Sequence, residues 1–299
     1  MLPAALQSTP SFHAIQPVPA VTLSLRETVE YALGAKGGGF RFALAQQTGL
    51  ACGLSSRAVD ELANGIESFH HASLIFDDLP CMDDASERRG RRCVHRVAGE
   101  SQAILAALAL VNRAYTSCWK VAAQYPLHCQ RAARVVERCI GELGILEGQS
   151  RDLAFEPSMG AKEVKAIAAG KTGALLHLTL VLPAILGGLS FSELLRLSRL
   201  ARCWGIAYQA MDDFQDLQLS SSNSGKTPFR DVIQQRPNLV VALGPQAAYR
   251  ELEYYLAGAG AQIDALQQLN AKWGYLSKFH AVMTGKEVEL RAALENVSV

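Results

Sequence analysis

Apolar residues recur at every third or fourth position along most of the chain, from Thr22 onward. This spacing predicts α-helices. Ala and Leu dominate these stretches, and the alternating β-branched runs that predict strands are rare. The clearest predicted helices cover residues 101–122, 131–151, 161–186 and 191–219. Breaks are expected where Gly, Pro or Ser gather, at residues 37–39, Pro126, Pro157, residues 187–188 and residues 220–225.

The predicted helices are too apolar around their circumference for a thin bundle, and no polar linker divides them. We therefore expect one large helical domain over residues 23–299. Residues 1–22 hold four of the eleven prolines and show little periodicity, so they are predicted to form a flexible N-terminal arm.

Composition narrows the class of protein. The 299 residues are 49% hydrophobic and 19% charged, which excludes a disordered chain. Lys and Arg total 29 against 28 Asp and Glu, and this balance argues against nucleic-acid binding. The longest apolar stretch, 178–189, is too short to span a membrane. Seven cysteines without a CxxC pair, and no visible secretion signal, predict a cytoplasmic protein with reduced thiols.

Two acidic clusters interrupt apolar runs. The first aspartate cluster is Asp77, Asp78, Asp83 and Asp84, and the second is Asp212, Asp213 and Asp216. In a helix, Asp212 and Asp216 share one face, where like charges repel. Pro80 is expected to end the first helix and to let Asp83 turn back toward Asp77. Mg²⁺ is the natural compensator, because it takes oxygen ligands and bridges carboxylates to phosphates.

Cationic residues follow both clusters. Arg88 and Arg89 come directly after the first, Lys171 opens an apolar stretch, and Lys226 follows the second. Arg and Lys are the expected partners of a diphosphate. Each cluster alone is compatible with a solvated helix end. Together, the clusters and cations beside apolar helices indicate a diphosphate leaving group that is held by metal and cations, while an apolar chain lies between helices and water is excluded.

These residues resemble the trans-prenyl diphosphate synthases of the polyprenyl synthase family, and within it the proteobacterial geranylgeranyl diphosphate synthases. The resemblance runs from about residue 25 to about residue 245. Residues 77–83 match the family's first aspartate motif, DDxxxxD, and residues 212–216 match its second, DDxxD. Further matches are the run from His70 to Ala85, Arg88-Arg89-Gly90, Gly148-Gln149, Asp152, Lys171-Thr172-Gly173 and Tyr208-Gln209.

The resemblance implies an all-α fold, a single large bundle of the terpenoid-synthase type with a central active-site cavity, assembled as a homodimer. It implies a Mg²⁺-dependent condensation of isopentenyl diphosphate with an allylic diphosphate. Asp77, Asp83 and Asp212 would bind Mg²⁺, supported by Asp78, Asp213 and Asp216. Isopentenyl diphosphate would contact Arg41, His70 and Arg89. The allylic diphosphate, or the cation formed from it, would face Arg88, Lys171, Thr172, Gln209 and Lys226.

The chain departs from the family near residue 40, where Gly-Gly-Lys-Arg-x-Arg-Pro is usual. Here Lys36 is followed by three glycines, Phe40 and Arg41. Arg41 matches the last Arg of that motif, and Lys36 is a shifted candidate for the Lys. Two alternatives therefore stay open: a terpene-synthase-like enzyme acting on one allylic diphosphate without condensation, and a regulatory subunit of another prenyl synthase.

Product length follows from a steric argument carried by the resemblance. In the family, the side chain five positions before the first motif forms the floor of the product cavity. Here that residue is Ala72, with Ser73 next to it. Small side chains leave the cavity long, which favours a C20 product, geranylgeranyl diphosphate, with the limiting residue supplied by another helix.

Overall fold

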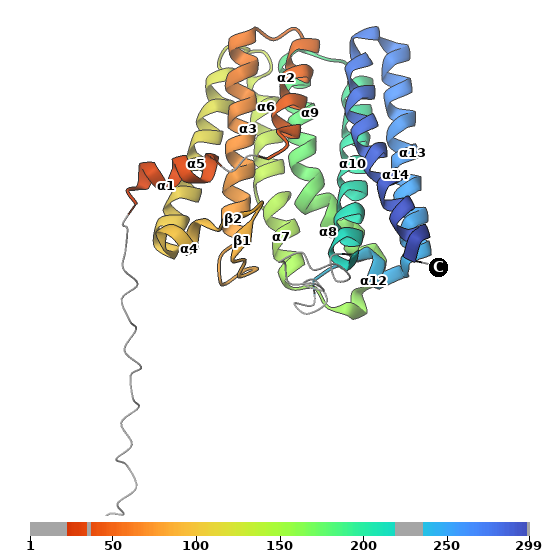
Figure 1. The fold of residues 1–299 in the computed structure, drawn as a ribbon. Helices are drawn as coiled ribbons and strands as arrows, with labels where there is room; N and C mark the ends of the chain where they lie inside the picture. The colour runs from red at the N-terminus through yellow and green to blue at the C-terminus, as the bar shows by residue number, and fades with distance from the viewer. Residues whose placement is uncertain (1–22, 35–36, 219–235, 298–299) are drawn as a thin grey trace, which may run out of the picture.

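The computed structural model describes residues 23–34, 37–218 and 236–297, and in these residues the fold is almost entirely helical, as predicted (Figure 1). The elements are α1 (Leu25–Leu33), α2 (Phe40–Ala51), α3 (Ser56–Asp77), β1 (Glu87–Arg88), β2 (Arg91–Arg92), α4 (Val94–Ala98), α5 (Glu100–Ala122), α6 (Cys129–Ile140), α7 (Ile145–Leu153), η1 (Pro157–Met159), α8 (Gly160–Ala168), η2 (Ala169–Gly173), α9 (Ala174–Leu186), α10 (Phe191–Gln218), α12 (Leu239–Leu243), α13 (Pro245–Leu269), η3 (Ala271–Gly274) and α14 (Tyr275–Val297).

The long helices pack side by side in one bundle. On one side α3 packs along α5 and α2, and on the other α10 packs along α9 and α13 (Figure 1). Helix α9 lies in the interior, and its side chains from Leu178 to Leu186 are all buried. Trp204 on α10 and Trp273 in η3 are fully buried in the same core cluster. One core cluster therefore runs through both halves of the described chain.

Most predicted helix positions are confirmed, but the helix predicted over 131–151 is wrong. It is divided into α6 and α7 by a short connection that contains Gly141 and Gly144. A Cβ on Gly144 would lie 2.2 Å from the carbonyl oxygen of Cys139, so the backbone folds back on itself more tightly than any other residue allows. The predicted arm over 1–22 and the predicted break at 220–225 lie outside the described residues.

A two-stranded hairpin, β1–β2, was not predicted from the sequence. Its strands are only two residues long and pair Glu87 with Arg92 and Arg88 with Arg91. The two turn residues, Arg89 and Gly90, have φ angles of 55° and 73°. Positive φ at both positions is the type I′ pattern that suits a tight hairpin, and it is unfavourable for an arginine. The hairpin lies beside the end of α3 (Figure 1).

Helices α8 and α9 are joined by a single π turn, η2, rather than by a loop. Among the described residues, the run Gly160–Leu186 passes a length and hydropathy test for a membrane helix, with 67% of its most apolar window buried inside the bundle. Its apolar composition is accounted for by its place in the core. A π turn inserts one extra residue into a helix and changes the direction of the side chains on it.

Candidate active site

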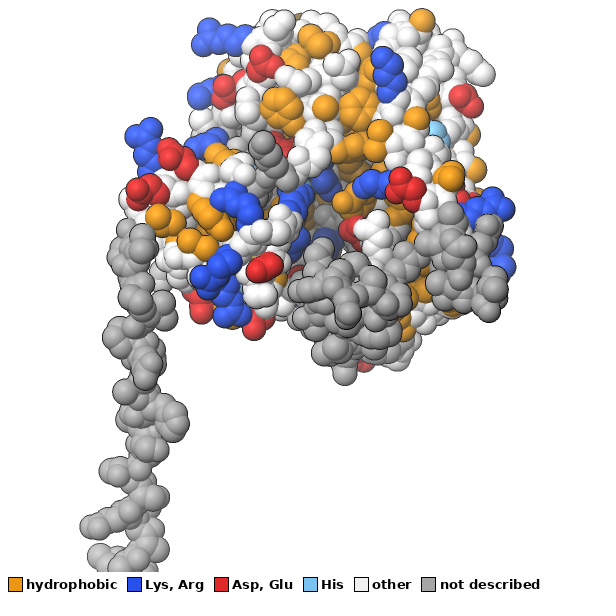
Figure 2. All heavy atoms as spheres, viewed as in Figure 1, with side chains coloured by type: hydrophobic (Ala, Val, Ile, Leu, Met, Phe, Trp, Pro, Cys, Tyr) orange, Lys and Arg blue, Asp and Glu red, His pale blue; other side chains and the backbone are white. Residues whose placement is uncertain are grey.

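A cavity of roughly 690 Å³ opens between the helices, lined by α2, α3, α5, α7, η2 and α10. Figure 2 shows a hollow near the middle of one face, with Lys and Arg side chains around it. One end of the cavity is polar and holds both aspartate clusters. The other end is apolar, and its lining side chains are Phe69, Leu74, Leu108, Val111, Tyr115, Ile140, Ile145, Leu146 and Leu175.

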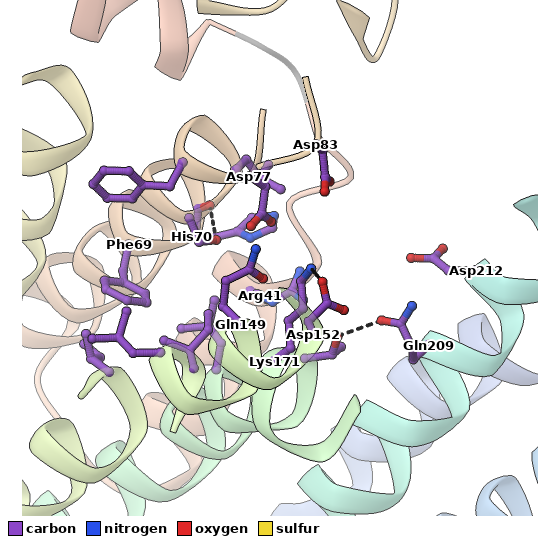
Figure 3. Close-up of a pocket in the computed structure, with 18 of the residues that line it drawn as sticks. Arg41, Phe69, His70, Asp77, Asp83, Gln149, Asp152, Lys171, Gln209 and Asp212 are labelled. Carbon is purple, nitrogen blue, oxygen red and sulfur yellow. Dashed lines mark hydrogen bonds and ion pairs between the residues drawn. The ribbon is translucent and has the colours of Figure 1, made fainter. Parts of the chain in front are cut away.

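The first aspartate cluster lies where α3 ends. The helix stops at Asp77, and Asp78 is its C-cap. The chain then turns back, so that the N–H of Asp83 donates a hydrogen bond of 3.0 Å to the carbonyl oxygen of Asp77. The predicted return of Asp83 after Pro80 is confirmed. Asp77 and Asp83 both line the cavity (Figure 3).

The second member of the first pair, Asp78, has a different environment. Its side chain is 6% exposed, and its Oδ1 accepts hydrogen bonds from Nε and Nη2 of Arg88 at 2.8 and 2.7 Å. Burial alone would lower the pKa of Arg88, but the hydrogen bond and charge of Asp78 outweigh it and raise that pKa. Asp78 is therefore part of the cavity wall, where it fixes the hairpin to the end of α3.

The second aspartate cluster is on α10. Asp212 and Asp216 line the cavity from one helix face, as their spacing predicted. Asp213 points the other way and is 1% exposed. Its Oδ2 accepts a 2.7 Å hydrogen bond from the N–H of Leu239, and its Oδ1 accepts one of 3.0 Å from Nε2 of Gln209. Asp213 thus joins α10 to α12.

Three ion pairs join the polar residues across the cavity. Nη2 of Arg236 lies 3.1 Å from Oδ1 of Asp83, and its Nη1 lies 3.6 Å from Oδ2 of Asp152. Nζ of Lys171 lies 3.1 Å from the same oxygen of Asp152. Asp152 on α7 therefore holds two cations at the polar end. The sequence does not indicate the pairing of Arg236 with Asp83, because these two residues are 153 positions apart.

Burial raises the pKa of Asp77 to about 6, because desolvation and the nearby charge of Asp83 outweigh the attraction of Lys171. Burial would lower the pKa of Lys171, but Asp77 and Asp152 reverse the effect and raise it. Lys171 is therefore a permanent cation, whereas Asp77 is a buried carboxylate that takes up a proton below about pH 6. A carboxylate in this state is suited to a metal ion that arrives with an anionic ligand.

The π turn aims two neighbouring residues at different helices. Lys171 reaches Asp152 on α7, while Oγ1 of Thr172 donates a 3.1 Å hydrogen bond to Oε1 of Gln209 on α10. Because Gln209 also donates to Asp213, the orientation of its amide is fixed. Oxygen lone pairs of Thr172 and Gln209 are therefore available beside the cavity, and Gln209 is labelled in Figure 3.

A second positive region is formed by Arg41 on α2, His70 on α3 and Arg89 in the hairpin turn. Burial, followed by the charges of Arg41 and Arg89, lowers the pKa of His70 to about 2, so its imidazole is neutral. Nε of Arg41 is buried without a hydrogen-bond partner. A Cβ on Gly37 would lie 2.3 Å from Nη1 of Arg89, so the glycine run passes directly over this guanidinium.

The apolar end corrects one prediction. Ala72 does not form the floor; it is fully buried against α1 and α5, in a core cluster with Val29 and Ala103. At 100° per residue, Ala72 lies about 140° from Asp77 around α3, whereas Ser73 lies about 40° from it. Ser73 and Phe69 therefore line the cavity. Tyr115 on α5 and Ile140 on α6 line the cavity from other helices.

The donor set fits Mg²⁺ bound together with a diphosphate. Within the described residues, no group of three or more His, Cys, Asp or Glu side chains is close enough to hold a metal by itself. Asp77, Asp83, Asp212 and Asp216 instead face the cavity from two sides. Mg²⁺ commonly takes one or two carboxylates, with waters and substrate phosphates as its other ligands. Carboxylates that face the cavity from two sides are suited to this kind of Mg²⁺ coordination.

The cavity brings together most of the residues predicted from the sequence: Asp77, Asp83, Asp212, Asp216, Arg41, His70, Arg88, Arg89, Lys171, Thr172 and Gln209. Asp78 and Asp213 lie in its walls, and Lys226 and Lys36 are outside the described residues. Asp152, Tyr208 and Arg236 also line the cavity, although the sequence gave them no stated role. The sequence feature that could have identified these three residues is a polar side chain within an apolar helix or beside a motif.

Comparison with known proteins gives consistent matches. A family described as polyprenyl synthetase matches residues 23–271. Geranylgeranyl pyrophosphate synthase 7, chloroplastic, of Arabidopsis thaliana is 32% identical over 84% of this chain and 73% of its own length. Geranylgeranyl pyrophosphate synthase 3, chloroplastic, of the same plant is 36% identical over 71% of this chain. The chain spans 60% of the length of that second relative.

Two solved structures extend the comparison. An FPP/GFPP synthase from Zymomonas mobilis is 25% identical with a TM-score of 0.71, covering 87% of this chain and 86% of that one. A geranyltransferase from Helicobacter pylori, complexed with magnesium and isoprenyl diphosphate, is 22% identical with a TM-score of 0.69, covering 88% and 91%. The second likeness concerns the fold alone.

Proposed function

This chain belongs to the polyprenyl synthetase family, and we propose that it condenses isopentenyl diphosphate with an allylic diphosphate in a Mg²⁺-dependent reaction, giving the C20 product geranylgeranyl diphosphate. The observation that carries the proposal is the division of the cavity. Aspartates and cations gather at one end, and mostly apolar or aromatic side chains line the other. A molecule with a charged head and a long apolar tail is complementary to both ends.

The allylic diphosphate would bind at the polar end. Asp77 and Asp83 line the cavity from the end of α3, and Asp212 and Asp216 line it from α10, so carboxylates from both clusters would hold Mg²⁺ together with the diphosphate. Bound Mg²⁺ supplies the positive charge that stabilises the departing diphosphate. Asp78 and Asp213 support these residues by fixing the hairpin and α12 to the helices that carry them.

This chain's own cations complete the leaving-group site. Lys171 and Arg88 line the cavity, and Lys226 is a further candidate from its place in the sequence. As the carbon–oxygen bond breaks, negative charge grows on the diphosphate, and preorganised cations stabilise it without rearrangement. The oxygens of Thr172 and Gln209 face the allylic carbon, where positive charge grows.

Isopentenyl diphosphate would bind in the second positive region, at Arg41, His70 and Arg89. The neutral imidazole of His70 donates a hydrogen bond to a phosphate oxygen but does not act as an acid. The double bond of isopentenyl diphosphate attacks the allylic cation, forming one carbon–carbon bond. The departing diphosphate accepts the proton that is then lost. The apolar end holds the growing chain and keeps water from the cation.

The decisive experiment is a product assay with Mg²⁺. Each of the C5, C10 and C15 allylic diphosphates is supplied with and without isopentenyl diphosphate, and products are identified by mass spectrometry. A C20 diphosphate that forms only with isopentenyl diphosphate supports the proposal. A hydrocarbon or alcohol made from an allylic diphosphate alone would instead identify a terpene-synthase-like enzyme. No turnover alone, with stimulation of an added prenyl synthase, would identify a regulatory subunit.

The assembly is proposed to be a homodimer. Leu108 and Leu146 line the apolar end of the cavity and are nevertheless 52% and 59% exposed. Ile104 and Leu105, on the same face of α5, and Leu143 are also exposed. A second copy over this face would exclude water from the cavity. Light scattering is expected to show a dimer, and Leu108→Glu is expected to give monomers; a monomeric wild-type protein would contradict this.

Location in the cell stays a prediction. The composition led us to expect a cytoplasmic protein, whereas the names of the plant relatives place those proteins in chloroplasts. Fractionation of cells that carry the native gene, with the protein detected by antibody, tests the expectation.

A further inference from the structure

The π turn η2 is held between two helices, and each helix touches it through a glycine. Ala169–Gly173 carries Lys171 and Thr172, the two residues that reach to opposite sides of the cavity. In a regular α-helix, neighbouring side chains are already 100° apart, and the extra residue of a π turn changes their direction further. The exact position of the turn therefore decides where both polar groups lie.

Helix α7 touches the turn on the Lys171 side. A Cβ on Gly148 would lie 2.3 Å from the backbone nitrogen of Lys171 and 2.6 Å from the carbonyl carbon of Gly170. A Cβ on Gly170 would in turn lie 3.1 Å from Cα of Gly148. The backbones of α7 and η2 are thus in direct contact, with no room for a single methyl group.

Helix α10 touches the turn on the Thr172 side in the same manner. A Cβ on Gly205 would lie 2.5 Å from Cα of Gly173 and 2.9 Å from its nitrogen. Each of these atoms is backbone, and backbone cannot rotate out of the way as a flexible side chain does. An alanine at either glycine requires one helix to move away from the turn.

Each glycine is followed, one turn later on the same helix, by the residue that bonds to the π turn. Four positions after Gly148, Asp152 accepts from Lys171. Four positions after Gly205, Gln209 accepts from Thr172. Positions i and i+4 share a helix face and are about 6 Å apart along the axis. Each helix therefore contacts the turn at two points, one by close backbone packing and one by a hydrogen bond.

We propose that Gly148 and Gly205 are positioning residues, which set how far the Lys171 ammonium and the Thr172 hydroxyl project into the cavity. Gly148 acts on Lys171 and so on diphosphate binding. Gly205 acts on Thr172 and Gln209 and so on the step in which positive charge forms. The roles of Lys171 and Thr172 come from the proposed function, so the inference rests on it.

The test compares Gly148→Ala and Gly205→Ala with a matched control, Gly187→Ala. A Cβ on Gly187 would lie 2.4 Å from the carbonyl oxygen of Cys52, an equally tight backbone contact at the other end of the same helical run, outside the cavity lining. Calorimetry with Mg²⁺ and inorganic pyrophosphate measures binding, and steady-state kinetics measures kcat and KM. Thermal melting measures the loss of stability in each of the three variants.

Gly148→Ala is expected to weaken pyrophosphate binding roughly tenfold, since a shift of about 1 Å in a positioned group has effects of this order or larger. Gly205→Ala is expected to lower kcat roughly tenfold while changing pyrophosphate affinity less than about threefold. Gly187→Ala is expected to melt earlier with binding and kcat within about twofold of wild type. Equal losses of binding and kcat in all three variants would overturn the inference.

A double-mutant cycle supplies the second test. The effects of Gly148→Ala and Lys171→Ala on pyrophosphate affinity should be strongly non-additive, because both act through the same ammonium. The effects of Gly148→Ala and Thr172→Ala should add. Additivity in both cycles would also overturn the inference. Because pyrophosphate binding needs no turnover, these outcomes are separable from a failure of the condensation assay, which would count against the proposed function alone.

Discussion

The two aspartate clusters look alike in sequence but are built differently. In each Asp-Asp pair the first residue lines the cavity and the second is a brace in the wall. The first brace, Asp78, is held by the side chain of Arg88, which comes from a hairpin. The second brace, Asp213, is held by a backbone N–H of α12 and by Gln209. Repetition of the same residue in a motif therefore hides a division into cavity-facing and structural roles.

The largest loss of activity is expected when the cavity-facing aspartate of either cluster is substituted. Asp77→Ala and Asp212→Ala are each expected to lower kcat/KM roughly 10³-fold, because each removes a metal-facing carboxylate. Steady-state assays with saturating Mg²⁺ measure this, and circular dichroism checks that both variants fold. Undiminished activity in either variant would remove that residue from the metal site, and unchanged activity of the variant in a reconstituted pair with an active synthase would favour the regulatory alternative.

Substituting the braces should separate the two clusters by stability. Asp213→Ala leaves the buried N–H of Leu239 and the amide of Gln209 without their acceptor, and we expect a loss of roughly 3 kcal/mol in the free energy of unfolding. Asp78→Ala leaves Arg88 without this carboxylate partner, but the Arg88 side chain is 32% exposed and partly solvated. The loss in the free energy of unfolding should therefore be smaller for Asp78→Ala, about 1–2 kcal/mol. Urea unfolding measures both, and the reverse order would contradict the difference in construction.

Acidification should act on the first cluster through Asp77. The pKa of Asp77 is raised to about 6, so below that pH a proton competes with Mg²⁺ for this carboxylate. Mg²⁺-dependent pyrophosphate affinity should fall by up to about tenfold per pH unit below 6.

The same shift has the opposite sign for the metal-free fold. Because the folded pKa lies above the unfolded value, protonation of Asp77 favours the folded state, and this contribution is lost as pH rises through about 6. Calorimetry between pH 5 and 7.5 measures the affinity of the folded protein for pyrophosphate in the presence of Mg²⁺. An affinity that does not change over this range would show that Asp77 is not among the ligands.

The smallest effect is expected at Asp84, the last member of the first cluster. Its carboxylate is 56% exposed and pairs with Arg96, which is 40% exposed, at 2.6 Å. Asp84→Asn removes the charge, and Asn tolerates the φ of 45° that the backbone adopts here. We expect a change within about 0.5 kcal/mol in unfolding and unchanged kinetics. A larger loss of activity would extend the metal-facing set to this residue.

Much of this organisation could be predicted from the sequence, because helix spacing and motif spacing are local properties. The shared face of Asp212 and Asp216 and the return of Asp83 toward Asp77 are of this kind. The pairing of Arg236 with Asp83 and Asp152 depends on packing between distant segments and could not be predicted. Ala72 was assigned to the cavity by counting positions, without the angle around α3 that turns it away.

The π turn also makes the chain sensitive to length. With its extra residue, the helix before the turn and the helix after it each keep their own angular phase toward the core. Removing one residue from Ala169–Gly173 would restore a regular α-helix with α8 and α9 in nearly the same phase, because the wide turn is what absorbs the extra residue. The directions of Lys171 and Thr172 within the turn would change instead. Between these two helices, the number of residues is therefore as much a part of the active site as their identity.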